Sequence, residues 1–128
     1  MSERHPERIP RDHRLRAARD FVALKAAGTV FRAKALVLVT LVRPGEPTRI
    51  GYVASKRSVG NAPQRNRARR RLREIVRRRW PRLPHAGFLL MLIANRHTLG
   101  TSHQALASEV EFVLASAGAL RPITAGSH

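Results

Sequence analysis

One stretch of the chain constrains its fold more than any other. Residues 65–79 contain nine arginines and a single acidic residue, Glu74. Like charges repel at helical spacing, so such a stretch is stable as a helix only if one face is buried against the rest of the protein. Four apolar residues at i, i+4, i+7 and i+8 supply that face: Ala68, Leu72, Ile75 and Val76. The pattern predicts a helix that is buried on one side and cationic on the other.

The flanking residues predict where this helix begins and ends. Asn61 is a good N-cap, and Pro63 fits the first turn, where its missing N–H costs little. Pro81 and Pro84 predict an end near Trp80. Opposite the apolar stripe, the helical spacing predicts an outward face made of Asn66, Arg70, Arg73 and Arg77, flanked by Arg67, Arg69 and Arg78.

The overall charge of the chain indicates which kind of partner this cationic face binds. The 128 residues carry 25 Lys and Arg against 8 Asp and Glu, a formal net charge of +17. The repulsion among these positive charges favours a polyanionic partner. Nucleic acid is such a partner, because a protein that neutralises its phosphates releases bound counterions and so binds more tightly. The arginine fork contacts two phosphate oxygens at once. A helix does not enter the major groove of duplex RNA, so we expect it to lie across the phosphates of a folded RNA.

Two other interpretations of the arginine helix fit its sequence less well. A solvated surface helix usually mixes both signs of charge, which this one does not. A membrane-surface helix needs a bulky apolar face that is free to insert, whereas this stripe is needed to cover a sheet. The longest apolar run, residues 88–94, is far shorter than the roughly 20 residues that span a bilayer. We therefore expect no membrane partner.

The remaining pattern predicts an αβββαβα order, an α+β two-layer sandwich of one sheet with helices. Leu15, Ala18, Val22 and Ala26 share a face of a first helix that Gly28 ends. Strands are expected at 29–33, 35–42 and 49–55, with a turn at Pro44-Gly45-Pro47 and an antiparallel hairpin between the second and third. Residues 88–94 predict a strand covered on both faces, and a last helix begins near Thr101, with Gln104 at capping-box spacing. Residues 1–14 are expected to be a flexible basic arm, 15–118 the single domain and 119–128 a short tail.

Nothing in the sequence suggests catalysis by the protein's own side chains. The chain has no cysteine, which excludes disulfides and thiolate chemistry and permits a reducing compartment. The N-terminus has no apolar stretch of the kind found in signal peptides, so we expect a cytoplasmic protein. The acids and histidines are scattered and form no acid/base or zinc pattern. We therefore expect no catalytic residue and no metal ligand in the protein.

A family resemblance rests on residues 52–74, YVASKRSVGNAPQRNRARRRLRE. Its Ser-Lys-Arg and Val-Gly-Asn-Ala lead-in, Arg-Asn-Arg core and Arg-Arg-Leu-Arg-Glu ending closely resemble the signature of the bacterial ribonuclease P protein subunit. The first helix with Asp20-Phe21, the strands and the late strand ending at Ile93-Ala94 are also similar, so the resemblance covers roughly residues 12–117.

The resemblance implies a function and a fold. Ribonuclease P is an endoribonuclease that removes the 5′ leader of precursor tRNA, and its large RNA supplies the active site and uses Mg²⁺. The protein, in an expected 1:1 complex, binds that RNA and the leader and is non-catalytic alone. The resemblance also implies a mixed sheet of about four strands with an unusual left-handed βαβ crossover.

The resemblance assigns residues to two RNA-binding surfaces. Arg65, Asn66 and Arg67 would face the catalytic RNA, supported by Lys56, Arg57, Asn61, Arg69, Arg70 and Arg73, and the outward position of Arg77 adds it to this set. A cleft between the first helix and the sheet would hold the single-stranded leader on aromatic side chains. Phe21 matches one such position, Lys25 and Val39 replace two others, and Phe31 is a candidate substitute. Phe21 could equally be a core residue.

Two alternatives stay open at this stage. One is a ribosomal-type structural RNA-binding protein, and the other is a nuclease that acts without an RNA subunit. The Arg-Asn-Arg helix with its lead-in favours the ribonuclease P subunit over both.

Overall fold

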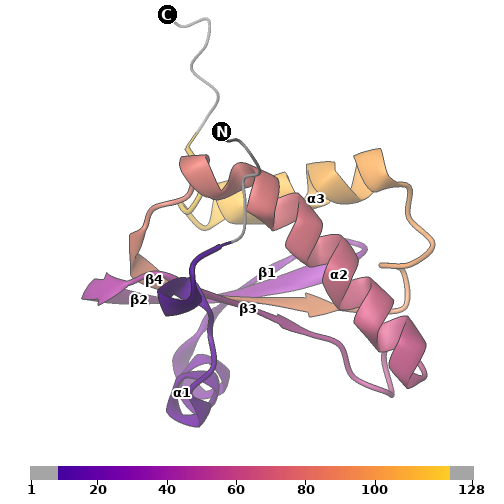
Figure 1. Cartoon of the computed structure of the whole chain (residues 1–128), viewed down its shortest axis with the longest axis horizontal. Coiled ribbons are helices and arrows are strands. Elements are labelled where there is room, and N and C mark those ends of the chain that lie inside the picture. Colours follow the sequence, from indigo (N-terminus) through magenta and orange to yellow (C-terminus); the bar gives the residue numbers. More distant parts are fainter. Residues whose placement is uncertain (1–8, 122–128) are drawn as a thin grey trace, which may run out of the picture.

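The computed structural model describes residues 9–121, which form one sheet with helices on both of its faces (Figure 1). In chain order the elements are η1 (Arg11–His13), α1 (Ala18–Ala27), β1 (Thr29–Arg32), β2 (Leu36–Pro47), β3 (Arg49–Val53), α2 (Ala62–Arg79), η2 (Trp80–Arg82), β4 (Ala86–Ala94) and α3 (His103–Ser116). Apart from the two short 3₁₀ helices, this is the αβββαβα order that the sequence predicts.

The sheet is mixed and has the strand order β1-β2-β4-β3. β1 pairs with β2 and β2 with β4 in antiparallel fashion, whereas β3 pairs with β4 in parallel. The predicted hairpin between the second and third strands is therefore wrong, because β4 lies between them. β4 is apolar on both faces and is stabilised by a central position with two neighbours. The crossover from β3 to β4 contains α2, and its left hand stays a prediction.

The segment at Pro44 does not end the second strand as predicted. β2 continues to Pro47, with an irregularity between Arg43, which pairs with Gly87, and Pro47, which pairs with Ala86. Gly45 has φ +85°, so the chain bends within the strand and then resumes its pairing. The turn-forming residues lie where the sequence predicts, but they form a bulge near the end of β2 and not a turn between two strands.

Alternation along the strands divides the core between the two faces of the sheet. Leu36, Leu38, Leu90 and Leu92 belong to the larger cluster, which α2 and α3 cover. Val39, Leu89 and Met91 belong to a smaller cluster under α1, together with Leu15 and Leu24. In Figure 1, α2 and α3 lie on one side of the sheet and α1 on the other. The first helix thus adds a partial third layer to the expected sandwich.

The predicted apolar face of the first helix is wrong. The helix begins at Ala18, so Leu15 is buried from the segment before it. The buried residues of α1 are Asp20 and Leu24, whereas Val22 is 65% exposed. One helical turn separates Asp20 from Leu24, and this side of the helix packs on the sheet. Alanines contribute little apolar area, so the sequence pattern could not distinguish the two faces.

The folded unit extends beyond both predicted domain boundaries. At the N-terminal end, Ile9 is buried in the larger cluster and Arg14 forms a bridge with Ile50. At the C-terminal end, Ala119 is fully buried and the backbone N–H of Arg121 donates to the carbonyl of Arg82. Residues 9–14 and 119–121 thus belong to the domain, and the rest of the predicted arm and tail lies outside the described residues.

The last helix is capped one residue later than predicted. Ser102 is the N-cap and accepts from the backbone N–H of Ala105, while the hydroxyl of Thr101 donates to the carbonyl of His97. The expected capping box of Thr101 and Gln104 is therefore wrong. The buried residues of α3 are Leu106, Ala107, Val110, Val113 and Leu114.

Candidate nucleic-acid interface

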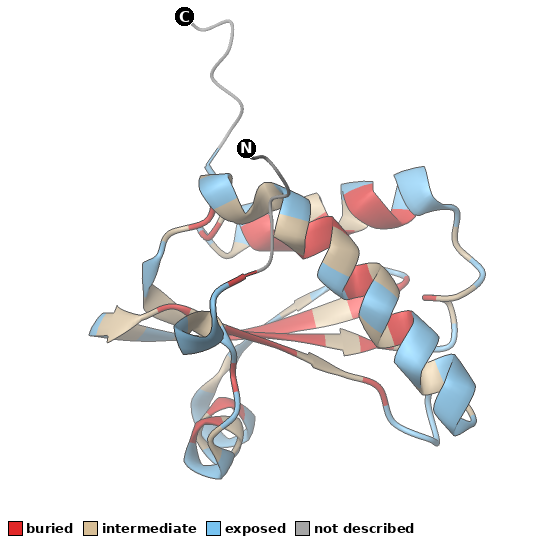
Figure 2. Cartoon of the chain, in the orientation of Figure 1, coloured by how far each residue is buried: buried red, intermediate tan, exposed pale blue. Residues whose placement is uncertain are grey.

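The apolar stripe fixes the rotation of α2 as predicted. The buried residues of this helix are Ala68, Leu72, Ile75 and Val76, each with an exposed fraction of 0%. On the opposite side, Asn66, Arg70 and Arg73 are exposed (Figure 2). The helix therefore presents its arginines to solvent from a rigid rod, because its buried side is fixed against the sheet and α3.

The N-terminus of α2 is held by a reciprocal capping box. The Asn61 side chain accepts from the N–H of Gln64, and the Gln64 side chain accepts from the N–H of Asn61. Gly60 has φ +134°, and a Cβ there would overlap Oε1 of Gln64. A guanidinium N–H of Arg65 donates to the carbonyl of Gly60 at 3.0 Å. Asn61, which was expected to bind RNA, thus has a structural role, since its Oδ1 serves the cap.

Several arginines of the outward face form no ion pair with an acidic residue of the described part of the chain. Within residues 9–121, no ion pair or hydrogen bond of the Arg67, Arg70 or Arg78 side chains is found. Arg73 lies over the ring of Tyr52, and Arg69 donates to Asn66 and to the carbonyl of Ala54. Neither interaction neutralises a guanidinium, so this face keeps its positive charge for an external anion.

Other arginines of the helix are engaged in holding it in place. Arg71 donates to the carbonyls of Thr98 and Leu99 at 2.6 and 3.1 Å. Arg79 forms an ion pair with Glu111 of α3 at 2.7 Å. The nine arginines predicted as one cationic stretch are thus divided by their orientation. Those nearer the buried stripe contact the protein, and those opposite it face solvent.

Arg77 and Glu74 form an ion pair within α2. The hydrogen bond from Arg77 lowers the pKa of the Glu74 carboxyl, and the nearby Arg78 and Arg73 add to this effect. Glu74 is therefore ionised at neutral pH. Arg77, which was expected to contact RNA, is thus partly neutralised by a carboxylate of its own helix.

The turn before α2 carries further cations. Lys56 and Arg57 are exposed on the segment that joins β3 to the helix. This turn is closed by the N–H of Val59, which donates to the carbonyl of Ser55 at 2.9 Å. The structure therefore places Lys56 and Arg57 just before the first turn of α2, where Arg65 and Arg67 begin the cationic face.

The second predicted surface, the leader cleft, is brought together only in part. Phe21 and Val39 share the smaller core cluster between α1 and the sheet, and Lys25 is exposed on α1 one turn after Phe21. Phe31 does not belong there. It is paired with Leu38 and packs on the larger cluster, on the face covered by α2 and α3. The residue in register with Val39 is Val30, so alternation turns Phe31 to the wrong side of the sheet.

Sequence analysis missed a second group of arginines near the N-terminal end of the domain. A hollow of about 760 Å³ is lined by Arg11, Asp12, Arg14, Arg16, Ala17, Arg19, Asp20, Pro47 and Arg49. The available signal was the density of arginines in residues 11–19. Its first part, residues 11–14, was assigned to a flexible arm, because the pairing of this segment with β3 leaves no local pattern.

These features define a class of protein: a basic α+β domain with a rigid arginine face built to bind a polyanion. The model of the ribonuclease P family matches residues 9–118, and the chain belongs to this family. It is 38% identical over 110 residues to the "Ribonuclease P protein component" of Symbiobacterium thermophilum, covering 85% of this chain and 94% of that one. It is 39% identical over 109 residues to the protein of the same name from Gluconacetobacter diazotrophicus, covering 84% and 93%.

Solved structures give the same result for the fold. The ribonuclease P protein of Staphylococcus aureus superposes with a TM-score of 0.74 at 23% identity, covering 85% of this chain and 98% of that one. The ribonuclease P protein of Thermotoga maritima superposes with a TM-score of 0.70 at 25% identity, covering 80% and 96%. The mixed four-stranded sheet with its helices is thus the architecture of these proteins. Among residues 9–121, no helix combines the length and the apolar character needed to span a bilayer.

Proposed function

We propose that this chain acts as the protein component of ribonuclease P and binds the RNA subunit of that enzyme through the outward face of α2. The observation that carries this is the orientation of the helix. Its buried stripe holds Arg67 and Arg70 toward solvent, and within the described chain no carboxylate pairs with them. Phosphates of a folded RNA are the counterions that best match such a surface.

The RNA-binding surface is proposed to begin at the N-terminus of α2. Arg65, Asn66 and Arg67 would lie against the RNA, with Lys56 and Arg57 on the preceding turn and Asn61 at the cap. Arg69, Arg70, Arg73 and Arg77 would extend the surface along the helix. The capping box and the bond from Arg65 to Gly60 hold this end of the helix in one conformation, which reduces the entropic cost of binding.

Catalysis is assigned in this proposal to the RNA subunit and its Mg²⁺ ions. What supports it is the engagement of five of the six acids between residues 9 and 121, Asp12 being the exception. Asp20, Glu46, Glu74 and Glu111 pair with arginines, and Glu109 accepts from the backbone N–H of Ala35. Carboxylates paired in this way make poor metal ligands or general bases, and no group of three or more candidate ligands gathers in this part of the chain.

The substrate is proposed to be precursor tRNA, with its 5′ leader lying between α1 and the sheet. Phe21 is half-buried and packs against the smaller cluster, and the exposed part of its side chain would stack on a base. Lys25 is exposed one turn later and would meet the leader backbone. Val39 is nearly buried and would form the apolar floor. A 1:1 complex with the RNA and a cytoplasmic location belong to the same proposal.

A reconstitution assay tests the proposal. The protein is mixed with ribonuclease P RNA and precursor tRNA at low Mg²⁺, and release of the 5′ leader is measured. The proposal predicts that the protein stimulates cleavage and has no activity without the RNA. An absence of stimulation would favour a structural RNA-binding role instead. Leader cleavage by the protein alone would assign the active site to the protein.

A further inference from the structure

We infer that the arginine-lined hollow at the N-terminal end of α1 is a second RNA-binding site, which takes backbone phosphates of an RNA strand. This inference goes beyond the α2 surface and rests on the proposed function, because it needs an RNA partner. The hollow lies at the start of β3, beside Arg49, whereas the Lys56–Arg57 turn and α2 follow the other end of that strand. The hollow is therefore separated from the N-terminal end of α2 by the length of β3, whereas the C-terminal end of α2 lies closer to it, since the Trp80 ring contacts that of His13 at 4.7 Å.

The charge of the hollow favours an anion. Five arginines line it, against two carboxylates, Asp12 and Asp20. The side chains of Arg11, Arg14 and Arg16 are exposed, and no ion pair or hydrogen bond of these three occurs within residues 9–121. The side chain of Arg19 is 79% exposed, and its Nε lies 3.8 Å from Oδ1 of Asp20. Unpaired guanidinium groups that face one concave surface favour bidentate binding of phosphate oxygens.

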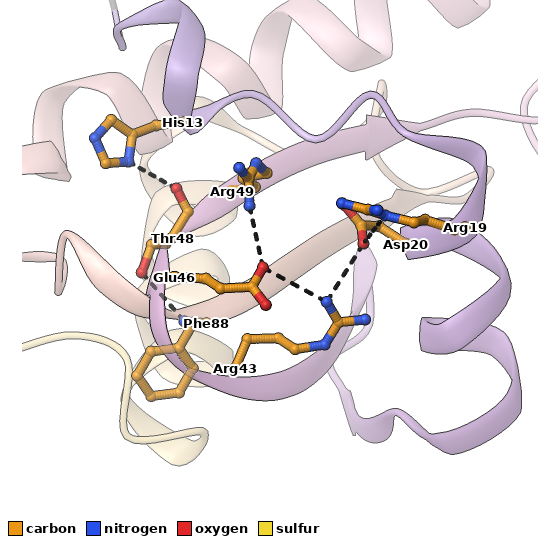
Figure 3. Close-up of polar contacts among 8 residues, drawn as sticks. All are labelled: His13, Arg19, Asp20, Arg43, Glu46, Thr48, Arg49 and Phe88. Carbon is orange, nitrogen blue, oxygen red and sulfur yellow. Dashed lines mark hydrogen bonds and ion pairs between the residues drawn. The ribbon is translucent and has the colours of Figure 1, made fainter.

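The negative charge of Asp20 is offset by Arg43, and Figure 3 shows this contact. Arg43, which does not line the hollow, lies 3.5 Å from Asp20 and 3.7 Å from Glu46, and Glu46 lies 3.6 Å from Arg49. The side chain of Asp20 is 3% exposed. Arg43 offsets the charge of the buried acid and Glu46 pairs with Arg49 at the wall, so the remaining exposed charge of the hollow is dominated by arginine.

The backbone that carries these arginines is anchored. The N–H of Leu15 donates to the carbonyl of Ile50 at 2.9 Å, and the His13 ring nitrogen donates to the carbonyl of Thr48 at 2.7 Å. The Leu15 side chain lies 3.0 Å from where a Cβ of Gly51 would be, so the glycine lets the segment lie close against β3. A preorganised backbone binds each phosphate at a smaller entropic cost than a mobile arm would.

The beginning of α1 adds to the attraction. Ala17 is its N-cap and provides no side-chain acceptor, so the N–H groups of Ala18 and Arg19 have no side-chain cap, whereas that of Asp20 donates to the carbonyl of Ala17. Ala17 lines the hollow. The volume of about 760 Å³ lies within the range of roughly 300–1,000 Å³ typical of small-ligand sites, which suits a nucleotide unit. Phosphates of the RNA subunit and of the substrate leader share this chemistry, and the experiment separates them.

The test compares two double variants of the full chain that remove the same charge. Arg14→Gln with Arg16→Gln removes two arginines of the hollow. Arg32→Gln with Lys34→Gln is the matched control, since both residues are exposed near the β1–β2 turn, at the other end of the sheet. Affinity is measured against salt concentration for ribonuclease P RNA, for precursor tRNA bound to the assembled enzyme, and for mature tRNA bound to it.

We expect the hollow variant to lower the slope of log affinity against log salt concentration by about 0.7–0.9 for each phosphate that is no longer neutralised. The control variant should leave this slope unchanged. A change with the RNA subunit assigns the phosphates to that RNA. A change confined to leader-bearing substrate assigns them to the leader. Equal slopes for both variants in every arm would overturn the inference while leaving the α2 proposal intact.

A second measurement protects the test against misfolding of a variant. Backbone amide shifts of the unmodified protein are followed during titration with a short single-stranded oligoribonucleotide. Saturable shifts in residues 11–19 and at Arg49 support the inference. Shifts confined to α2 and the preceding turn contradict it. If the unmodified protein binds none of these RNAs, the proposed function fails together with this site.

Discussion

The guanidinium group of Arg73 lies over the ring of Tyr52, with its central carbon 5.4 Å from the ring centroid. This contact joins β3, which carries Tyr52, to α2, which carries Arg73. The ring of Tyr52 packs against the larger core cluster, and its hydroxyl oxygen is buried without a hydrogen bond. One aromatic residue thus supports the orientation of an RNA-facing arginine and carries an unsatisfied polar atom.

Tyr52→Phe is therefore expected to leave stability at pH 7 unchanged or to raise it by up to about 1 kcal/mol. The variant keeps the ring under Arg73 and removes a buried hydroxyl that has no partner. The measurement is the free energy of unfolding by urea. A destabilisation of more than about 1 kcal/mol would mean that the hydroxyl has a partner in solution.

The same residue predicts a pH dependence. Burial raises the pKa of the Tyr52 hydroxyl well above its usual value near 10, and Arg73 opposes this effect only in part. Because the folded-state pKa is raised, the stability contribution is complete below pH 10 and decreases as the pH rises above it. The decrease should approach about 1.4 kcal/mol per pH unit. Tyr52→Phe should show a shallower decrease between about pH 10 and 11.5, and identical profiles would contradict the assignment.

Arg71→Ala should destabilise the fold without changing the RNA-binding surface. Its guanidinium donates to two carbonyls of the segment after β4, and hydrogen bonds from charged groups contribute roughly 1.5–3 kcal/mol. Thermal unfolding measures the destabilisation. Well below the melting temperature, the salt dependence of RNA binding should match that of the unmodified protein. A flattened slope would place Arg71 at the RNA.

Gly60→Ala tests the entry into α2. At φ +134° a side chain is strained, and the new Cβ would displace the Gln64 amide from the capping box. We expect the unfolding free energy to fall by about 1–3 kcal/mol. Gly100→Ala is a suitable control, since nothing lies within 4 Å of its Cβ position. Similar stabilities for the two variants would mean that the cap tolerates the change.

Phe21→Ala addresses the proposed leader cleft. Removal of a stacking ring should weaken binding of leader-bearing precursor tRNA by roughly 1–3 kcal/mol per base that stacks on it. Binding of mature tRNA should be unaffected, because it has no leader. An equal weakening for the two RNAs would instead make Phe21 a core residue of the smaller cluster.

The arginine helix was largely predictable from sequence because its evidence is local. The stripe from Ala68 to Val76, the Asn61 cap and the proline stop each act within a few residues, and all of them are confirmed. The end and the two-sided burial of β4 were predictable for the same reason, since a continuous apolar run determines both, although the strand begins at Ala86 and not at Phe88.

Features that depend on distant parts of the chain were not predictable. Alternation shows that a strand has two faces but not which strand lies beside it, so the pairing of β3 with β4 was missed. The side of the sheet on which Phe31 lies depends on a register of one residue against β2. Arg11 and Arg14 were wrongly assigned to a flexible arm, because the segment that carries them is held by hydrogen bonds to Ile50 and Thr48, which lie far along the chain.

The salt dependence of binding tests the central claim most directly, namely that the outward face of α2 binds RNA phosphates. Affinity for ribonuclease P RNA is measured between about 50 and 200 mM salt for the unmodified protein, for Arg65→Ala with Arg67→Ala, and for Arg71→Ala as the control on the same helix. The account predicts that the double variant binds more weakly, with a slope lower by about 0.7–0.9 for each phosphate that its arginines no longer neutralise, and that the control keeps its slope. An unchanged slope in the double variant would contradict the account.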